Sequence, residues 1–460
     1  MINNIINEIN SYDKVLILGY GREGKSTFKF IRKYLSDKHL YIADSNEKLV
    51  EANPELDSDD NITLILGSNC LDNLNDYDLI IKSPGINFKN IDYSSFEDKI
   101  TSEIDLFLRF SNCKTIGVTG TKGKSTTSSL IYHVISNMYD NTLFAGNIGI
   151  PVFEKIEEVN ENTIFVLELS CHQLKFVKAS PNISVLLNLY EEHLDLYKSY
   201  EDYIFAKLNI FKYQKENDYK IWGLDSKDAN KYFKDDNNTY TYSTNETNKG
   251  VTVKEDGLYL NGKLVYLKSR KRNLLGEHNY INIAPVLIVA YILGLDLDRV
   301  CDLVDDFKPL EHRLEYVGNY SGIDFYNDSI STIPMTCINA VNAIDNAYTV
   351  IIGGLDRGID YSELVDYLYS SNKIKTVLCL KDTGYMIADE LNNRNSDKTI
   401  IKAIDMEDAV RLAYEHTAKG SACLLSPAAA SYNTYKNFEE RGKAYKNYIE
   451  EYCRKEDNHE

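Results

Sequence analysis

The chain of 460 residues lacks long apolar runs, paired cysteines and an excess of positive charge. No run of about 18 apolar residues occurs, and the N-terminal MINNIINEINSYDK has no apolar signal-peptide stretch, so we expect neither membrane insertion nor export. The eight cysteines never form CxxC, which predicts reduced thiols in a cytoplasmic protein. A formal net charge of −18 argues against a protein that binds nucleic acid through bulk charge.

What the chain does contain is a repeated alternation of short apolar runs with helical patterns. Runs such as VLILG (15–19) and TIGVTG (115–120) are continuously apolar, as is typical of strands covered on both faces. Their alternation with helices predicts an α/β fold with mostly parallel sheets. The Asn261-Gly262 pair, between two alternating runs, predicts a type I′ hairpin. We divide the chain into three domains, residues 1–102, 103–309 and 310–460.

Two glycine-rich loops follow predicted strands. The first, GYGREGKS, satisfies Gly-x-Gly-x-x-Gly with Gly19, Gly21 and Gly24, and literally the P-loop pattern as well. Asp44 lies 20 residues after Gly24, where dinucleotide-binding folds hold a ribose. This loop therefore favours the diphosphate of a nucleotide, although a generic glycine turn before a helix remains open.

The second loop, TGTKGKST (119–126), lies between a predicted strand and an amphipathic helix. Val118 replaces the first glycine of the strict pattern, so the loop is a shortened variant. Lys124 would reach the β- and γ-phosphates, and the hydroxyl of Ser125 or Thr126 would ligate Mg²⁺. Glu168, at the end of the run IFVLELS, is placed to be a second metal ligand. We therefore expect the triphosphate at this loop.

A series of motifs that follow one another in a fixed order along nearly the whole chain makes it resemble the Mur ligase family. The motifs that carry this resemblance are TGTKGKSTT (119–127), GNIG (146–149), LELSCHQL (167–174), NLYEEHLDLY (188–197), YIFAKLNIF (203–211), GEHNYIN (276–282), LEHRLE (310–315), YNDSIST (326–332) and LLSPAAASYNTYKNFEERG (424–442). Within the family, GYGREG, KSPGI (82–86) and the KNFEERG ending resemble the members that add D-glutamate to a sugar-nucleotide precursor.

The resemblance implies a fold and a reaction. A Rossmann-like UDP-substrate-binding domain, a central ATP-binding P-loop domain and a C-terminal Rossmann-like, amino-acid-binding domain would follow one another. ATP would phosphorylate the carboxylate of UDP-N-acetylmuramoyl-L-alanine, and the amine of glutamate would displace phosphate from the acyl phosphate. The partners would be these three small molecules, with two Mg²⁺ ions, no nucleic acid and no membrane, and we expect a monomer.

The resemblance also assigns residues to the ATP and metal sites. Lys124, His193, Lys207 and Asn147 would be the catalytic residues, and Lys207 would be carbamylated by CO₂, which requires a neutral amine. Ser125, Glu168, His193 and carbamylated Lys207 would hold metal. ATP would contact Gly120, Thr121, Lys122, Gly123, Lys124, Ser125, Thr126, Asn279, Asn282, Arg313 and Asp328.

The other two substrates are assigned in the same way. The UDP-substrate would contact Gly19, Gly21, Arg22, Glu23, Gly24, Asp44, Ser45, Ser83, Gly85, Asn147 and Ser170. Glutamate would contact Thr332, Arg357, Ser431 and Phe438, with the Arg357 guanidinium binding a carboxylate through two parallel hydrogen bonds.

Three departures from the family pattern concern the acceptor loop and the glutamate pocket. Glu192 replaces the aspartate before the loop histidine, and Arg357 replaces a lysine, with a different geometry. The usual DSKATN reads DSISTI, so that Ile330 replaces a lysine near the amino acid. We expect D-glutamate as the substrate and keep L-glutamate as the alternative.

Other functions remain as alternatives. A folylpolyglutamate-synthase-like ligase would lack the N-terminal glycine-loop domain. A non-catalytic nucleotide switch would not need Lys207, His193 and a glutamate pocket together. A dehydrogenase would account for only about the first hundred residues.

Overall fold

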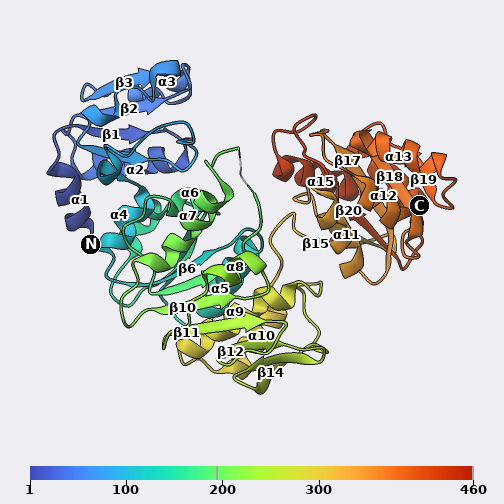
Figure 1. The fold of residues 1–460 in the computed structure, drawn as a ribbon. Coiled ribbons are helices and arrows are strands. Elements are labelled where there is room, and N and C mark those ends of the chain that lie inside the picture. Colours follow the sequence, from blue (N-terminus) through green and yellow to red (C-terminus); the bar gives the residue numbers. More distant parts are fainter. Residues whose placement is uncertain (193–194, 458–460) are drawn as a thin grey trace. The chain divides into compact units, whose positions relative to one another are not determined.

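The computed structural model describes residues 1–192 and 195–457. The chain divides into two compact units, which are described separately. The first consists of Met1–Arg270 and Ile281–Val304, and the second of Lys271–Tyr280 with the chain from Asp305 onward. In the described residues three sheets form, each flanked by helices, which confirms the α/β class (Figure 1). The predicted three-domain boundaries stay a prediction.

The N-terminal sheet of the first unit is parallel throughout, with the strand order β3-β2-β1-β4-β5. Its central strand is the predicted VLIL run, and all four of these side chains are buried because helices lie against the sheet. The strands are β1 (Val15–Leu18), β2 (Leu40–Asp44), β3 (Ile62–Leu66), β4 (Leu79–Lys82) and β5 (Ile100–Thr101). The helices are α1 (Ile2–Asn10), α2 (Arg22–Tyr34), α3 (Leu49–Ala52) and α4 (Glu103–Phe110).

The second sheet of this unit has nine strands in the order β14-β13-β12-β11-β10-β9-β6-β8-β7. It is parallel from β7 to β12 and antiparallel at β13 and β14. Its strands are β6 (Lys114–Thr119), β7 (Thr142–Gly146), β8 (Ile164–Glu168), β9 (Ile183–Leu186), β10 (Tyr219–Gly223), β11 (Thr239–Ser243), β12 (Gly250–Val253), β13 (Gly257–Leu260) and β14 (Lys263–Leu267). The helices are α5 (Lys124–Ser136), α6 (Cys171–Leu174), α7 (Tyr200–Lys212), α8 (Lys227–Tyr232), α9 (Asn279–Ile292) and α10 (Leu297–Asp306), with a 3₁₀ segment at Val152–Glu158.

The predicted hairpin is confirmed between β13 and β14. Asn261 and Gly262 both have positive φ, 48° and 81°, as a type I′ turn requires. The hairpin is the antiparallel end of an otherwise parallel sheet.

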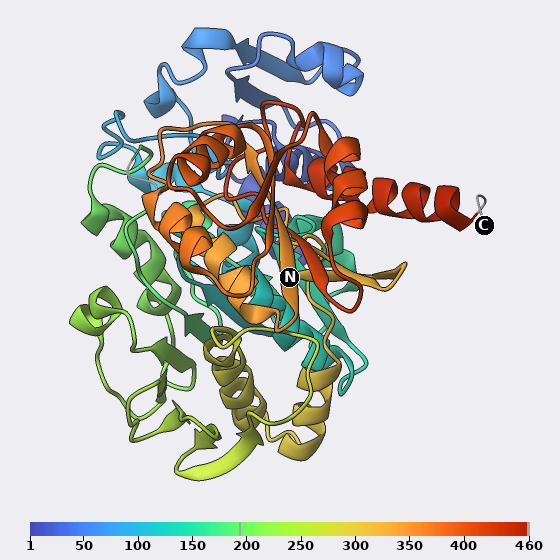
Figure 2. The same cartoon turned by 90° about the vertical axis from the view of Figure 1, so that its right-hand side faces the viewer.

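The sheet of the second unit has six strands in the order β15-β16-β20-β17-β18-β19, and only the β15–β16 pair is antiparallel. The long terminal helix α15 (Phe438–Asp457) is the red helix near the C-terminus in Figure 2. The strands are β15 (Glu315–Tyr320), β16 (Ile323–Asn327), β17 (Ala347–Gly354), β18 (Thr376–Asp382), β19 (Thr399–Lys402) and β20 (Ala422–Leu425). The other helices are α11 (Pro334–Ala343), α12 (Ser362–Ser370), α13 (Thr383–Asn393) and α14 (Met406–His416).

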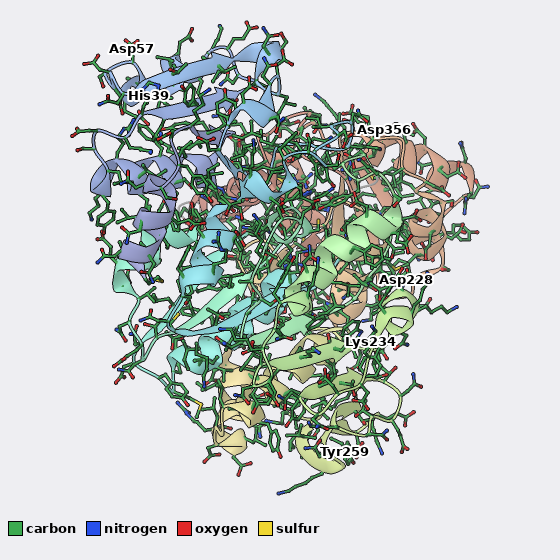
Figure 3. The ribbon with its side chains drawn as sticks, turned by 60° about the vertical axis from the view of Figure 1, so that its left-hand side comes forward. His39, Asp57, Asp228, Lys234, Tyr259 and Asp356 are labelled. Atoms are coloured by element: carbon green, nitrogen blue, oxygen red, sulfur yellow. The ribbon has the colours of Figure 1, made fainter. Side chains whose placement is uncertain are left out.

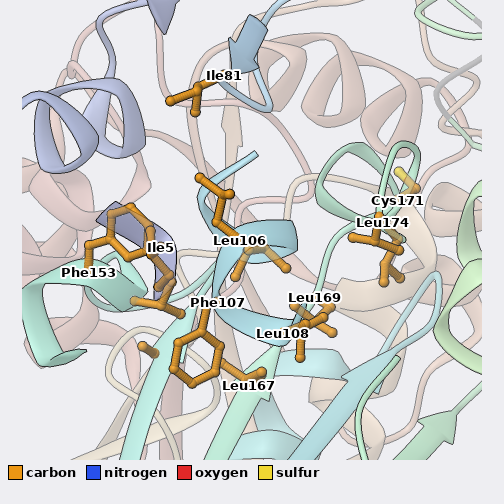
Figure 4. Packing of buried hydrophobic residues seen from close by; sticks show 14 of the residues in the cluster. Ile5, Ile81, Leu106, Phe107, Leu108, Phe153, Leu167, Leu169, Cys171 and Leu174 are labelled. Atoms are coloured by element: carbon orange, nitrogen blue, oxygen red, sulfur yellow. The ribbon is translucent and has the colours of Figure 1, made fainter. Parts of the chain in front are cut away.

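One apolar core joins the two sheets of the first unit. Ile5 from α1 and Ile81 from β4 belong to the same buried cluster as Phe153 and Leu167 of the nine-stranded sheet region (Figure 4). Helix α1, which was not among the predicted elements, contributes the fully buried Ile5 and Ile9 to this cluster. Because this core is shared, side chains of both sheets can be placed precisely around one ligand.

The surface of the protein is charged, as the composition indicates. Asp57, Lys234 and Asp356 are exposed side chains of this kind (Figure 3). Among the described residues no helix is both long and apolar enough to cross a bilayer. All eight cysteines are free, as expected for reduced thiols.

Candidate active site

The second glycine-rich loop connects β6 to α5, as predicted. Gly123 precedes the helix with a φ of 84°, and a Cβ at this position would lie 2.4 Å from Asn282 Oδ1. Only glycine therefore fits there. Lys124 Nζ donates to the carbonyl oxygens of Gly120 and Thr121, both at 3.0 Å, so the ammonium is folded over its own loop. Burial lowers the pKa of Lys124.

Asn188, which the sequence analysis quoted in a motif but gave no role, holds this loop in place. Its Oδ1 accepts from the backbone N–H groups of Thr121 at 3.1 Å and Lys122 at 2.8 Å. Its Nδ2 donates to the Lys122 carbonyl oxygen at 3.0 Å. The Thr121 hydroxyl bonds to Tyr203 OH at 2.9 Å, which links the loop to α7. The loop is therefore rigidly positioned by long-range side-chain contacts.

Lys207 on α7 is 1% exposed, and its Nζ donates to the Gly120 carbonyl oxygen at 2.8 Å. Burial lowers the pKa of Lys207 to about 7, and the positive charge of Lys124 acts in the same direction. Carbamylation requires a neutral amine, and burial and the neighbouring positive charge both favour the neutral form of Lys207. A large fraction of this amine is neutral near pH 7, which is the form that reacts with CO₂.

Glu168 ends β8 beside the same loop and is 1% exposed. Its Oε1 accepts from Asn147 Nδ2 at 2.7 Å and its Oε2 from Ser128 Oγ at 3.5 Å. Two predicted site residues, Asn147 and Glu168, are thus joined directly by a hydrogen bond. His193, also predicted here, lies outside the described residues. Its neighbour Glu192 forms an ion pair with Lys122 at 2.6 Å.

These residues are chemically suited to ATP and Mg²⁺. A buried carboxylate and the Ser125 or Thr126 hydroxyl are hard oxygen ligands of the kind that Mg²⁺ prefers. The hydroxyl of Thr119, the first residue of the loop, is buried without a hydrogen-bond partner among the described residues. Such an orphaned group at the mouth of a phosphate loop is suited to a polar ligand.

The two asparagines that were predicted to contact ATP at the adenine have different surroundings. Asn282 lies against Gly123 and accepts from Thr127 Oγ1 at 3.4 Å, so its side chain belongs to the phosphate-loop cluster. Asn279 Nδ2 donates to the Leu275 carbonyl oxygen at 2.5 Å within the second unit. Their contact with adenine stays a prediction.

The first glycine-rich loop connects β1 to α2, as predicted. A Cβ on Gly24 would lie 1.9 Å from the Gly19 carbonyl oxygen, so glycine is needed for the close helix–strand approach. Asp44 accepts from the backbone N–H groups of Tyr20 and Asn46 at 2.8 and 2.9 Å. Ser83 Oγ donates to the Gly19 carbonyl oxygen at 2.6 Å. Asp44 and Ser83 thus support the loop, and their predicted substrate contacts remain untested.

Glu23 connects the two sheets of this unit through Gln173. Gln173 Nε2 donates to Glu23 Oε1 at 2.6 Å, while Gln173 Oε1 accepts from Ser170 N and Oγ at 2.9 and 3.0 Å. Burial raises the pKa of Glu23 to about 7. The S-x-x-Q spacing of Ser170 and Gln173 is a capping box, a signal from which Gln173 could have been found. Of the other predicted residues here, Arg22 donates to the Gly149 carbonyl oxygen at 3.2 Å and Ser45 is exposed.

A cavity of about 250 Å³ lies between the N-terminal sheet and the nine-stranded sheet. Three predicted substrate residues, Gly85, Asn147 and Ser170, line it, although they are far apart in sequence. Lys82 and Lys175, which the sequence analysis did not single out, line it as well. The remaining lining residues are Pro84, Ile86, Asn87, Phe88, His172, Phe176, Leu196 and Tyr197.

In the second unit, Phe438 begins α15, and the other predicted glutamate residues, Thr332, Ser431 and Arg357, lie in three loops. They follow β16, β20 and β17, which are neighbours in the sheet, so their carboxyl ends meet at one edge. Arg357 Nη2 donates to the Thr332 carbonyl oxygen at 3.2 Å, which brings two predicted residues together. Ser431 is buried, and the Phe438 carbonyl oxygen accepts from Ser329 Oγ at 2.8 Å.

Arg441, which was not predicted, holds these loops together. Its guanidinium donates to Ser329 Oγ at 3.0 Å, to the Ser329 carbonyl oxygen at 2.8 Å and to the Ala429 carbonyl oxygen at 3.0 Å. It is 2% exposed, and burial lowers its pKa to about 10. Asp328 accepts from Ser331 and Ser426 hydroxyls at 2.5 and 2.8 Å, and burial raises its pKa to about 6, against which the charge of Arg313 acts.

Comparison with known proteins agrees with this arrangement. Residues 118–290 match the Mur ligase middle domain, and residues 312–429 match the domain described as Mur ligase, glutamate ligase domain. Two solved structures from Thermotoga maritima share the fold: MurF ligase in complex with ADP (TM-score 0.59, 19% identity, 96% of this chain and 95% of that chain) and the UDP-N-acetylmuramate-alanine ligase MurC (TM-score 0.60, 20% identity, 96% and 99%). The chain belongs to the Mur ligase family, which confirms the resemblance seen in the sequence.

Two relatives of higher sequence identity are ligases that bear the same name. The UDP-N-acetylmuramoylalanine–D-glutamate ligase of Clostridium botulinum (strain Langeland) is 32% identical over 449 residues, covering 95% of this chain and 96% of the relative. The enzyme of the same name from Clostridium kluyveri is 32% identical over 445 residues, with the same coverage of both chains.

Proposed function

We propose that the protein is an ATP-dependent ligase that adds D-glutamate to UDP-N-acetylmuramoyl-L-alanine in peptidoglycan precursor synthesis. The observation that carries this proposal is the likeness to ligases of that name over 95% of the chain. The site supports it, because Lys207 donates to the Gly120 carbonyl oxygen of the loop that contains Lys124, and Glu168 ends β8, the strand that pairs with β6. We also propose that the protein acts as a cytoplasmic monomer.

The proposed reaction needs an activated carboxylate. A carboxylate oxygen attacks the γ-phosphorus of ATP and ADP leaves. The amine nitrogen of glutamate then attacks the carbonyl carbon of the acyl phosphate, loses a proton, and phosphate departs as the amide forms. The backbone N–H groups of the second glycine-rich loop and the Lys124 ammonium would stabilise the charge on the transferred phosphoryl group.

The residues at this loop divide the remaining tasks. Glu168 and the Ser125 hydroxyl would hold Mg²⁺, which supplies a positive charge opposite the phosphate oxygens when it is bound. Asn147 orients the Glu168 carboxylate through its 2.7 Å hydrogen bond. Lys207, neutral in part near pH 7 because of its burial, would carry the carbamate and add a negative charge to the metal site.

The two other substrates are proposed at separate places. The sugar nucleotide would bind at the first glycine-rich loop and in the cavity lined by Gly85, Asn147 and Ser170. Glutamate would bind at the loop edge of the second unit near Thr332, Arg357, Ser431 and Phe438. We infer that the first and third domains are Rossmann-like, because their sheets are mostly parallel and their predicted binding residues lie in loops at the carboxyl ends of the strands.

The enantiomer of glutamate is tested with purified protein, UDP-N-acetylmuramoyl-L-alanine, ATP and either D- or L-glutamate. The readout is phosphate release together with mass analysis of the product. We expect turnover with D-glutamate. Preferred turnover with L-glutamate would overturn this assignment, and Ile330, which replaces the family's lysine, would then explain the change. No release with either enantiomer would overturn the ligase function.

A further inference from the structure

Lys82 is a buried cation on the wall of the cavity in the first unit. It ends β4 and is 7% exposed. Its Nζ donates to the Ser83 carbonyl oxygen at 3.1 Å and lies 5.3 Å from the ring centre of Phe88 and 5.8 Å from that of Phe176. Among the described residues, no carboxylate oxygen lies within 4.0 Å of it. A buried ammonium without a close counter-ion is unusual, because burial disfavours charge.

A second cation faces the same cavity. Lys175 Nζ forms an ion pair with Asp202 at 3.0 Å and lies 4.9 Å from the ring centre of Tyr197. Its side chain is 13% exposed, so its charge also lies mostly out of solvent. Asp202 therefore neutralises Lys175, and Lys82 lacks an equivalent partner.

The charges around Lys82 are consistent with this arrangement. Burial lowers the pKa of Lys82 to about 7, the positive charge of Lys175 adds to the effect, and the negative charge of Glu23 opposes it. Glu23 is engaged elsewhere, since Gln173 donates to it at 2.6 Å. His172 and Tyr197 are the other titratable side chains that line the cavity. In the free protein Lys82 is therefore the cavity-lining cation that has no close counter-ion among the described residues.

We propose that Lys82, assisted by Lys175, binds the diphosphate of the uridine nucleotide sugar. This inference rests on the proposed function, and it adds a specificity-determining residue to the substrate site. The diphosphate is favoured as the bound anion because Lys82 directly precedes Ser83, whose hydroxyl contacts the Gly19 carbonyl oxygen of the first glycine-rich loop at 2.6 Å. The cavity wall and the phosphate-binding end of that loop are thereby adjacent.

If Lys82 binds the diphosphate, removing its charge should raise the stability of the protein and lower its affinity for the nucleotide. In Lys82→Met, the buried charge is removed and the thioether packs against Phe88 and Phe176. The melting temperature should therefore rise at pH 6, where the lysine is charged. Affinity for the nucleotide should fall about 10- to 100-fold, since a charge-assisted hydrogen bond is lost. A merely structural lysine would lower the melting temperature on removal.

The test is calorimetric titration of the full chain with UDP-N-acetylmuramoyl-L-alanine, UDP and uridine, alongside ATP. The matched control is Lys89→Met, which removes a lysine of the same segment that does not line the cavity. We expect Lys82→Met to weaken both diphosphate ligands and to leave ATP unchanged, and Lys89→Met to weaken none. Titration in two buffers of different ionisation enthalpy should show proton uptake by the wild type at pH 8, reduced in Lys82→Met.

Three results would overturn the proposal. Unchanged affinity for UDP in Lys82→Met would show that Lys82 does not bind the diphosphate, while the ligase function stands. A loss confined to the full substrate would assign Lys82 to its carboxylate instead. If the wild type binds ATP but no uridine nucleotide, the proposed function itself fails, and this inference fails with it.

Discussion

Asn188→Ala tests whether a distant side chain shapes the phosphate loop. The substitution removes the hydrogen bond from Lys122 N at 2.8 Å and the one to the Lys122 carbonyl oxygen at 3.0 Å. The bond from Thr121 N is only partly lost, because this N–H also donates to the Asn188 backbone carbonyl oxygen at 3.0 Å. At roughly 0.5–1.5 kcal/mol for each bond, the loss is about 2 kcal/mol. If the loop must be reordered to bind ATP, the KM for ATP rises about 30-fold.

The matched control is Asn182→Ala, at the opposite end of the same strand. Asn182 Oδ1 accepts from Thr115 N and Oγ1, both at 3.0 Å, and its Nδ2 donates to Asp218 at 2.9 Å. This variant should lower the melting temperature but leave the KM for ATP within twofold of wild type. Steady-state kinetics with ATP and with the sugar nucleotide varied in turn distinguish the two. An unchanged KM for ATP in Asn188→Ala, or an equal rise in both variants, would refute the reasoning.

Three further predictions concern other parts of the protein. Because the pKa of Lys207 is lowered to about 7 from its usual 10.5, the unfolded chain binds the extra proton between these values, so the folded state gains stability as pH rises through this window. In CO₂-free buffer, wild type should gain about 1.4 kcal/mol per pH unit relative to Lys207→Met between pH 7 and 9, measured by denaturant unfolding; parallel curves would contradict this. Arg441→Lys should lower the melting temperature, because at least one carbonyl oxygen of Ser329 or Ala429 loses its donor, which costs about 1–3 kcal/mol of stability. The affinity for ATP, measured by calorimetry, should stay unchanged. A variant as stable as wild type would disprove this prediction. Gly24→Ala should destabilise the first unit strongly, since the new Cβ would lie 1.9 Å from a backbone oxygen. At Gly21 no atom lies within 4 Å of the new Cβ, so Gly21→Ala should lower the stability by less than about 0.5 kcal/mol. Thermal melts measure both effects, and equal melting temperatures for the two variants would count against this reasoning.

The local structure around both glycine-rich loops was predictable from short sequence patterns. A continuous apolar run, a glycine loop and a helix follow one another within about 25 residues at Val15–Leu18 and again at Lys114–Thr119. The same is true of the Asn261-Gly262 turn, whose positive φ values are a property of these two residue types. Such features depend on neighbours in the chain, and so the sequence carries them directly.

Other features needed the folded structure because they depend on residues far apart in the chain. Asn188 contacts the loop 66 and 67 residues earlier, and no local pattern distinguishes it from an ordinary turn asparagine. The same holds for Arg441, whose contacts with Ser329 join residues 112 apart. The helix α1 was missed because its short apolar face, with Ile5 and Ile9, acquires meaning only against the shared core.

The sequence by itself determined the α/β class, the two loops, the family and the residue types available for catalysis. Only the tertiary structure decided which of those residues are buried together. Lys207 and Lys82 are both lysines after apolar stretches, and their pKa values near 7 come from burial beside a second cation. Burial and charge proximity are properties of the packed molecule, because they sum over neighbours from many segments. The sequence therefore determines which titratable residues are present, and the folded structure determines their pKa values.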